Sequence, residues 1–159
     1  MAEYSGRLRR VGRIAIVVSR YNELVTAKLL DGARACCAEA GLAESDIDVY
    51  WVPGAFELVG AADAAARHGG YACVVALGAV VRGETPHFDF VAGETTRGLG
   101  DIVLRRSVPV GFGLLTVDTM TQARERAGGA SGNKGYEAAE AAIRSADLLS
   151  QMETDAPRP

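Results

Sequence analysis

The stretch that decides the fold is residues 74–94, VVALGAVVRGETPHFDFVAGE. Its first part, 74–81, contains only apolar and small residues, and the polar run 82–87 follows at once. This pattern predicts a buried strand that ends in a short loop, with a helix beginning after His87. Open α/β sheets bind ligands at loops of this kind, because backbone N–H groups and positive helix ends converge there. The stretch therefore predicts a parallel sheet with a site at one edge.

The segments on either side repeat the same alternation of strand, loop and helix. Strands are predicted over 13–18, 47–52, 72–81 and 108–117. The first helix is predicted to end at Gly41, the second to run from about Ala55 to His68 and the third to follow His87. A short helix from Thr119 to Ala127 comes next, followed by a loop over 128–133 and a last helix over 134–152. Short connections between alternating strands and helices predict a three-layer α/β/α sandwich around a four-stranded parallel sheet, with a flavodoxin-like fold.

The chain of 159 residues is expected to form one domain. We predict an N-terminal arm over 1–12, a single α/β domain over 13–152 and a mobile C-terminal tail over 153–159. A four-stranded sheet is small, so exposed edges or an oligomer are expected. Three glycines in the helix after His87 indicate either close helix packing in an assembly or a kinked, frayed helix, and the sequence does not decide between them: Gly93, Gly98 and Gly100.

Composition excludes several classes of protein. The 17 basic and 20 acidic side chains give a net charge of −3, which argues against general binding of nucleic acid or anionic membranes. No apolar run approaches the roughly 18 residues that span a bilayer, and no secretory signal is visible. The odd number of cysteines, with Cys36 and Cys37 adjacent, indicates free thiols in a reducing compartment. A cytoplasmic protein is expected.

Every unusual polar cluster follows a predicted strand: 19–22, 54–57, 82–87 and Asp118. The carboxyl ends of parallel strands lie along one edge of a sheet, so these clusters are expected to share one cleft. His87 at a helix entrance is suited to proton transfer near neutral pH, or it is a surface or capping residue. Glu57 beside Phe56 either favours the helix dipole or binds a polyhydroxylated ligand.

The loop 83–85 offers backbone donors and a hydroxyl group to an anion at a helix N-terminus. Three cations are candidates for the charge that a phosphate requires: Arg82, Arg126 and Lys134. The alternative for Arg126 is that it ends a short helix, where a cation is favoured in any case. The alternative for Lys134 is a solvated surface residue after a glycine-rich loop. Tyr21 either stacks on a flat ligand or covers the core. The chain contains no P-loop motif and no metal-binding spacing of His and Cys, so no metal is expected.

Four segments together resemble the lumazine synthase family: SRYN at 19–22, PGAFEL at 53–58, ALGAVVRGETPHFDFV at 76–91 and QARERAGGASGNKG at 122–135. The resemblance implies condensation of 5-amino-6-(D-ribitylamino)uracil with 3,4-dihydroxy-2-butanone 4-phosphate. The product is 6,7-dimethyl-8-ribityllumazine, and phosphate and water are released without a metal or organic cofactor. The expected enzyme is a transferase of riboflavin biosynthesis.

The resemblance also implies roles for individual residues. His87 matches the residue that transfers protons, and Arg126 matches the residue that stabilises the leaving phosphate. Substrate-binding positions match Tyr21, which stacks on the pyrimidine, Ala55, Phe56 and Glu57 for the ribityl chain and ring, Val80 and Val81 in the pocket wall, and Glu84 and Thr85 for the phosphate. Phe112, Arg126 and Lys134 match positions that reach in from a neighbouring subunit.

The departures from the family pattern are mild. Tyr21 stands where the family has Phe or Trp, no proline follows Glu57, and Ala130 replaces a lysine of some members. Members of the family form pentamers, decamers or shells of sixty subunits. The short loop at 128–133 favours the icosahedral shell, in which the arm resembles a segment that adds a strand to a neighbour's sheet. Riboflavin synthase is the candidate protein partner.

Three other functions remain as alternatives. A binding protein would keep the pocket for riboflavin-like compounds without turnover. A container protein would use the shell, with catalysis secondary. A flavodoxin-like electron carrier would purify with tightly bound yellow flavin. Product formation from both substrates, and the activity of a His87→Ala variant in an intact shell, distinguish the enzyme from these proteins.

Overall fold

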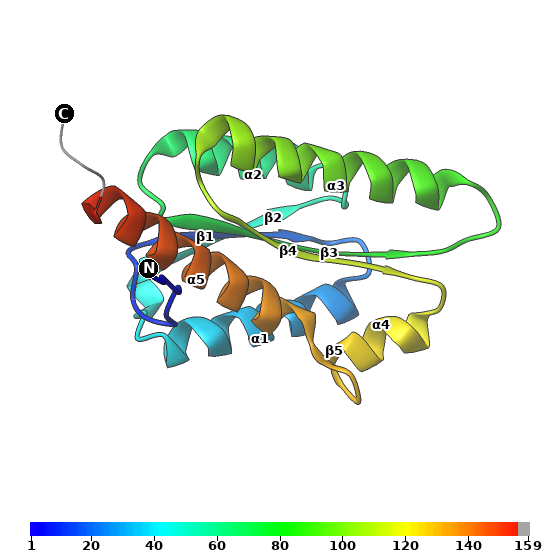
Figure 1. Ribbon diagram of the computed structural model, residues 1–159. Helices are drawn as coiled ribbons and strands as arrows, with labels where there is room; N and C mark the ends of the chain where they lie inside the picture. The colour runs from blue at the N-terminus through cyan, green and yellow to red at the C-terminus, as the bar shows by residue number, and fades with distance from the viewer. Residues whose placement is uncertain (156–159) are drawn as a thin grey trace.

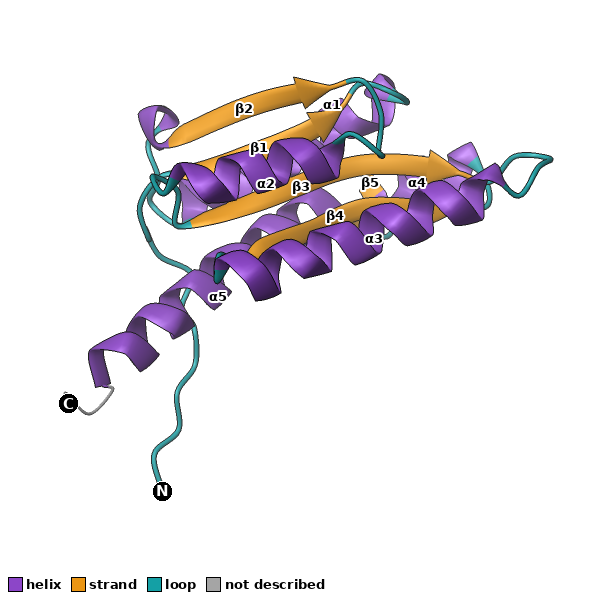
Figure 2. Ribbon diagram, turned by 90° about the horizontal axis from the view of Figure 1, so that it is seen from above, coloured by secondary structure: helices purple, strands orange, loops and turns teal. Residues whose placement is uncertain are grey.

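The four-stranded sheet is at the centre of the molecule. A computed structural model describes residues 1–155 and shows three layers, with the sheet between two layers of helices (Figure 1). The strands are β1 (Ile14–Ser19), β2 (Ile47–Val52), β3 (Cys73–Val81) and β4 (Val110–Val117). All pairs are parallel and the order is β2-β1-β3-β4, so the arrows point the same way (Figure 2). The predicted flavodoxin-like α/β/α fold is confirmed.

Two long helices lie on each face of the sheet. Helices α1 (Glu23–Glu39) and α5 (Lys134–Asp155) lie on one face, and α2 (Leu58–His68) and α3 (His87–Arg106) lie on the other (Figure 1). All of β1 is buried, because Ile14, Ile16 and Val18 pack toward α1 and α5 while Ala15 and Val17 pack toward α2 and α3. A continuous apolar strand is what a doubly covered parallel sheet requires.

Most of the predicted helix boundaries are close to the observed ones. Gly41 and Gly69 follow α1 and α2 with φ of 87° and 76°, values that glycine adopts without strain. Helix α2 begins at Leu58, later than predicted, because 53–57 form a turn. The side chain of Thr119 accepts a hydrogen bond from the N–H of Gln122 (3.2 Å) at the start of α4 (Met120–Arg126). The side chain of Gln122 in turn accepts a hydrogen bond from the N–H of Asp118 (2.8 Å).

The segment predicted as a loop over 128–133 is mostly a small hairpin. Strands β5 (Ala127–Gly129) and β6 (Gly132–Asn133) pair antiparallel, with a turn between them. The side chain of Asn133 then accepts hydrogen bonds from the N–H groups of Gly135 and Tyr136, and donates to the carbonyl of Lys28. The prediction was wrong because glycine-rich composition does not show that a tertiary contact with α1 fixes the segment.

The glycines of α3 have different surroundings. The helix continues from His87 to Arg106, so they do not break it. A Cβ at Gly98 would lie 2.8 Å from the Val59 side chain, so α2 and α3 pack closely within one chain at this point. A Cβ at Gly93 or Gly100 would meet nothing within 4 Å. Packing inside the chain thus accounts for one of the three glycines.

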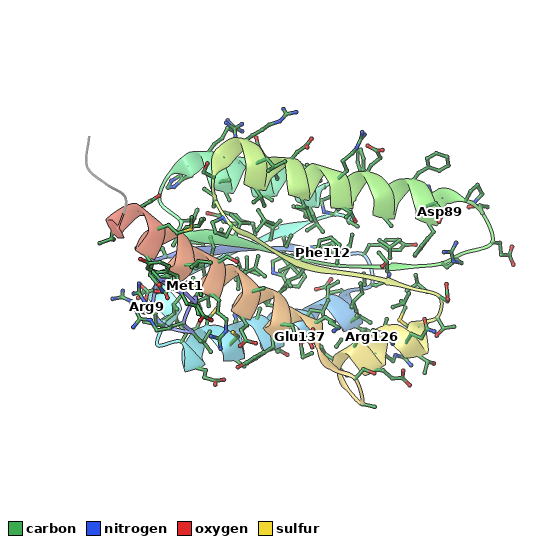
Figure 3. The ribbon with its side chains drawn as sticks, in the orientation of Figure 1. Met1, Arg9, Asp89, Phe112, Arg126 and Glu137 are labelled. Atoms are coloured by element: carbon green, nitrogen blue, oxygen red, sulfur yellow. The ribbon has the colours of Figure 1, made fainter. Side chains whose placement is uncertain are left out.

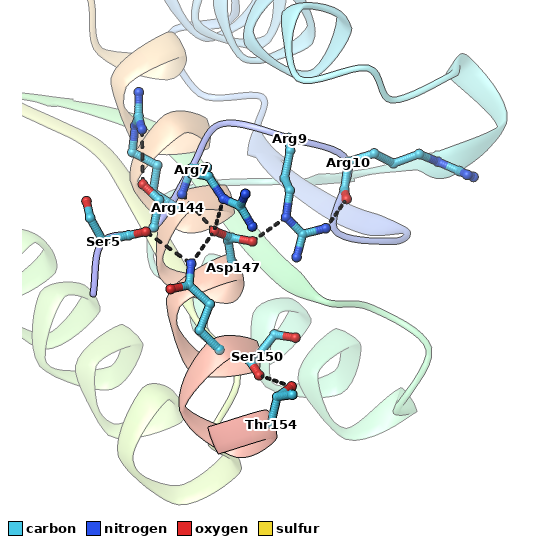
Figure 4. A network of polar contacts seen from close by, with 10 residues as sticks. Ser5, Arg7, Arg9, Arg10, Arg144, Asp147, Ser150 and Thr154 are labelled. Atoms are coloured by element: carbon cyan, nitrogen blue, oxygen red, sulfur yellow. Dashed lines mark hydrogen bonds and ion pairs between the residues drawn. The ribbon is translucent and has the colours of Figure 1, made fainter. Parts of the chain in front are cut away.

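The N-terminal arm lies against α5 of the same chain (Figure 4). Asp147 on α5 has no exposed side-chain surface, and it accepts a hydrogen bond from the N–H of Arg7 (2.8 Å) and pairs with the Arg9 guanidinium. Arg10 pairs with Asp46 (2.8 Å). Strand addition to a neighbouring sheet stays a prediction.

Helix α5 ends at Asp155, three residues past the predicted end of the domain, and 156–159 of the predicted mobile tail lie outside the described residues.

We expect Asp147 to make stability pH-dependent. The hydrogen bond from Arg7, with those from Arg9 and Gln151, lowers the pKa of Asp147 to about 2. An unfolded aspartate titrates near pH 3.9, so the stabilisation is complete above that value and is lost as the pH falls toward 2. Asp147→Asn should therefore lower the urea midpoint at pH 7, with a difference from wild type that vanishes near pH 2. The exposed Asp101→Asn serves as control, and a difference that does not depend on pH would contradict the expectation.

The three cysteines are buried and form no disulfide. Burial raises the pKa of Cys36 and Cys73 to about 12 and that of Cys37 to about 11, so these thiols are protonated at neutral pH. The expected free thiols are confirmed. Within residues 1–155, none of the helices has the length and apolar character needed to cross a membrane.

Candidate functional site

A cavity of about 720 Å³ lies at the carboxyl edge of the sheet, on the side covered by α2 and α3. Its lining comes from the segments that follow β1 and β2, from the end of β3 and the loop after it, and from the first turns of α3. The topology therefore brings together clusters that lie far apart in the sequence. The lining residues are Tyr21, Gly54, Ala55, Phe56, Glu57, Ala79, Val80, Val81, Gly83, Thr85, His87, Phe88, Phe90, Val91 and Glu94.

Tyr21 lies on the cavity in a tightly held turn after β1. Its N–H donates to the carbonyl of Pro53 (3.0 Å), and the ring is 72% exposed. The next residue, Asn22, has φ 59° and ψ 44°, a left-handed conformation that asparagine tolerates better than most residues. The Asn22 amide donates to the carbonyl of Ala79 (3.0 Å), which itself lines the cavity. The backbone therefore fixes an exposed aromatic ring that is available for stacking.

The turn between β2 and α2 supplies a second part of the wall. Ala55 is buried and accepts a hydrogen bond from Thr95 of α3. Phe56 is 61% exposed, and Glu57 occupies the N-cap position of α2 without a side-chain capping bond. An apolar ring and a carboxylate thus lie side by side, an arrangement that suits a ligand with a flat ring and a hydroxylated chain.

The third part of the wall is the stretch that ends β3 and begins α3. Val80 and Val81 end the strand, and Gly83, Thr85 and His87 follow on the loop and at the first residue of the helix. Helix α3 has no side-chain cap at Pro86, so its first turn presents uncapped N–H groups. Both α2 and α3 begin at the cavity, and their positive ends favour a bound anion. Glu84 is exposed on the same loop and does not line the cavity.

The first turns of α3 contribute residues that the sequence analysis did not propose. Phe88, Phe90, Val91 and Glu94 line the cavity together with His87. The spacing 87, 90, 91 and 94 places side chains on one face of a helix, and this periodicity was the signal that could have found them. Glu94 is paired with Arg97 of the same helix at 2.5 Å. The cavity is consequently more aromatic than predicted, and it has a second carboxylate.

Arg82 is placed differently from the prediction that it supplies charge to a phosphate. It does not line the cavity, and its guanidinium pairs with Asp118 (2.9 Å) and Asp89 (3.5 Å). The hydrogen bond to Asp118 raises the pKa of Arg82, and the charges of Asp89 and Asp118 act in the same direction. Asp118 thus contacts the cavity-forming loop through Arg82, without lining the cavity itself.

Three residues implied by the resemblance lie away from the cavity of their own chain: Phe112, Arg126 and Lys134. Phe112 is on the edge strand β4 and is 48% exposed, while Arg126 lies at the end of α4 on the opposite side of the sheet from α3 (Figure 3). The Arg126 side chain donates to the carbonyl of Gln122 (3.2 Å), and Lys134 pairs with Glu137 (2.6 Å). A single chain therefore does not bring these groups to His87.

Within residues 1–155, no three side chains of His, Cys, Asp or Glu are grouped so that they could hold a metal ion. A family model described as 6,7-dimethyl-8-ribityllumazine synthase matches residues 12–150. The matched range contains every residue that lines the cavity as well as Phe112, Arg126 and Lys134.

Proposed function

The chain belongs to the 6,7-dimethyl-8-ribityllumazine synthase family, and we propose that it catalyses the reaction for which the family is named. The substrates would be 5-amino-6-(D-ribitylamino)uracil and 3,4-dihydroxy-2-butanone 4-phosphate. The observation that carries the proposal is the cavity, in which exposed aromatic rings, a histidine and two uncapped helix starts face one space. A flat ring, a polyhydroxylated chain and a phosphate are the three features that these groups suit.

Each part of the cavity has a proposed task. Tyr21 stacks on the pyrimidine, while Phe56 and Glu57 bind the ribitylamino side, with Ala55, Val80 and Val81 as wall. The amides at Gly83 to Thr85 and the start of α3 bind the phosphate, with Glu84 contributing only its backbone. His87 moves protons while the aromatic amine and the ketone form an imine, and again as phosphate and water leave. Holding two reactants in register supplies much of the remaining acceleration, since orientation alone is worth about 7–11 kcal/mol.

The site is completed, in this proposal, by a second copy of the chain. Phe112, Arg126 and Lys134 do not line the cavity of their own chain, and Phe112 is 48% exposed on an edge strand. We infer a homo-oligomer built from pentamers, with the sixty-subunit shell as the expected form and riboflavin synthase as a candidate partner. A cytoplasmic location and the absence of any cofactor belong to the same proposal.

The test of the function is an assay with purified protein and both substrates, in which the fluorescence of the lumazine product is followed over the uncatalysed background. An excess that is lost when either substrate is omitted would support the enzyme. If the assembled oligomer gives no excess, the binding or container function replaces it. The absorbance of the purified protein provides a further control, because a tightly bound yellow flavin would favour an electron carrier.

We expect Arg126→Ala to weaken chiefly the phosphate-bearing substrate. Loss of a charge-assisted hydrogen bond should raise its KM by about 10- to 100-fold, with a smaller change for the pyrimidine. Steady-state kinetics at saturating second substrate measures this effect. The matched control is Arg124→Ala on the same helix, where the side chain is exposed. Equal effects of the two substitutions would contradict the assignment.

Mixed assemblies test whether Arg126 serves a neighbouring cavity. His87→Ala and Arg126→Ala subunits are denatured, mixed and refolded together, and each is also refolded alone. If the two residues act from different subunits, random mixing rebuilds about a quarter of the sites with both residues intact. Activity above the sum of the two separate samples would support the shared site. Activity equal to that sum would place both residues in one chain.

A further inference from the structure

We propose that Arg82 is a positioning residue that fixes the turn of α3 bearing His87 against the loop that follows β4. This inference rests on the proposed function, because it concerns the residue to which proton transfer is assigned. Arg82 is then not a phosphate ligand but a brace, by which we mean a side chain that holds the first turn of α3 against the loop after β4.

Arg82 contacts three separate elements. Its N–H donates to the carbonyl of Val117 (2.8 Å), which fixes its backbone where β3 and β4 end. Its Nε donates to Asp118 Oδ1 (2.9 Å) in the loop before α4, and its Nη1 donates to Asp89 Oδ1 (3.5 Å) in the first turn of α3. The guanidinium carbon lies 4.3 Å from the centre of the Phe88 ring. One side chain therefore joins the end of β3, the start of α3 and the loop after β4.

Two of these contacts are with the residues that directly follow His87. Phe88 and Asp89 are in the first turn of α3, and the described residues provide no side-chain cap for that turn. Asp118 is itself held, because its N–H donates to the side chain of Gln122 (2.8 Å). Stacking on Phe88 and pairing with Asp89 thus tie the His87 turn to a fixed point outside the cavity. The planar fork of arginine suits such simultaneous contacts better than lysine does.

The same contacts argue against a direct role in binding phosphate. A phosphate ligand should point free donors into the cavity, whereas Arg82 is absent from its lining. Two carboxylates face the single positive charge of the guanidinium. The charge that Arg82 could offer to an anion is therefore already balanced by Asp89 and Asp118.

The brace acts on geometry more than on stability. The side chains of Arg82, Asp89 and Asp118 are 47%, 63% and 67% exposed, and ion pairs this exposed contribute little to folding. A displacement of about 1 Å at a reacting group, however, can lower turnover by about 10²-fold. Loss of Arg82 is thus expected to change kcat while the assembly and its unfolding midpoint stay the same.

The experiment compares Arg82→Ala, Asp118→Ala and the double variant with wild type. Steady-state kinetics gives kcat and KM, inhibition by inorganic phosphate reports the anion site, and amide hydrogen exchange reports the mobility of 82–89. We expect kcat to fall by about 10- to 100-fold in Arg82→Ala, to fall in the same direction in Asp118→Ala, and to fall no further in the double variant. Exchange over 82–89 should become faster. The control is Arg105→Ala, which removes a 77% exposed arginine of α3 and should change none of these quantities.

Asp118→Ala distinguishes a positioning role of Arg82 from a phosphate-binding role, because the two roles predict opposite effects on kcat and on inhibition by phosphate. If Arg82 bound phosphate, removal of Asp118 would free its charge, so phosphate would inhibit more strongly and kcat would not fall. That result would overturn the proposal, and so would full activity in Arg82→Lys, since lysine supplies charge without the planar fork. If wild type made no lumazine, the proposed function would fail, whereas unchanged hydrogen exchange in Arg82→Ala would overturn the brace on its own.

Discussion

Replacing His87 by alanine is expected to lower kcat by about 10²- to 10⁴-fold, the range that a positioned acid or base contributes to proton transfer. His87 is exposed at the first residue of α3 and lines the cavity, so its removal takes away a proton carrier without disturbing packed residues. The proposed oligomer should still form, and its unfolding midpoint should be that of wild type. Turnover with both substrates, measured on variants whose assembly has been verified by native mass, provides the test.

His68 provides the matched control, because it is the other of the two histidines in the chain. It lies in the last turn of α2, and its ring centre is 5.4 Å from that of Tyr71, far from the cavity-lining residues. His68→Ala should leave turnover unchanged. Equal turnover of the His87→Ala variant and wild type would remove His87 from the mechanism, and an unassembled His87→Ala variant would show that the residue is structural.

Replacing Gly135 by alanine is expected to destabilise the protein by about 3 kcal/mol or more, at or beyond the upper end of typical overpacking effects. A Cβ at this position would lie 1.9 Å from the carbonyl oxygen of Leu29, which belongs to the backbone of α1. A helix carbonyl cannot move aside as a flexible side chain can. Soluble yield, together with urea unfolding at a fixed subunit concentration, measures the effect, since assembly makes apparent stability depend on concentration.

Gly100→Ala is the control for this substitution, because a Cβ there would meet nothing within 4 Å. Alanine is favoured over glycine inside a helix by about 0.5–1 kcal/mol, so this variant should be slightly more stable than wild type. Similar midpoints for the two variants would show that α1 and α5 adjust to the added methyl group. Loss of stability in Gly100→Ala would instead reveal a contact that only the assembly makes.

His87→Ala tests a cavity residue of the motif at 76–91, whereas Gly135→Ala tests a packing residue of the motif at 122–135. His87 is exposed at the cavity, whereas Gly135 lets α5 approach α1. Asn133 has a related structural task, since it caps α5 and donates to Lys28, and a Cβ at Gly32 would lie 2.2 Å from its Oδ1. In the second motif, much of the pattern therefore serves the contact between α1 and α5.

The sequence by itself determined the sheet and the edge at which the cavity lies. The apolar runs within 13–18 and 72–81 predicted strands that are covered on both faces, and Gly41 and Gly69 marked the ends of helices where φ is positive. Periodicity and turn chemistry act over a few residues, so they can be read locally. Parallel strands put their carboxyl ends at one edge, which is why Tyr21, Glu57 and His87 were expected to lie together.

The tertiary structure alone decided which groups share contacts across the molecule. Nothing local to 128–133 shows that a hairpin forms there, since α1 fixes the segment through Asn133. The charge of Arg82 suggested a phosphate ligand, but in the structure its guanidinium pairs with Asp89 and Asp118. Phe112 and Arg126 do not line the cavity of their own chain. The physical reason is common to these cases: hydrogen bonds, charge pairs and close contacts depend on distances between elements, which the local pattern of a sequence does not encode.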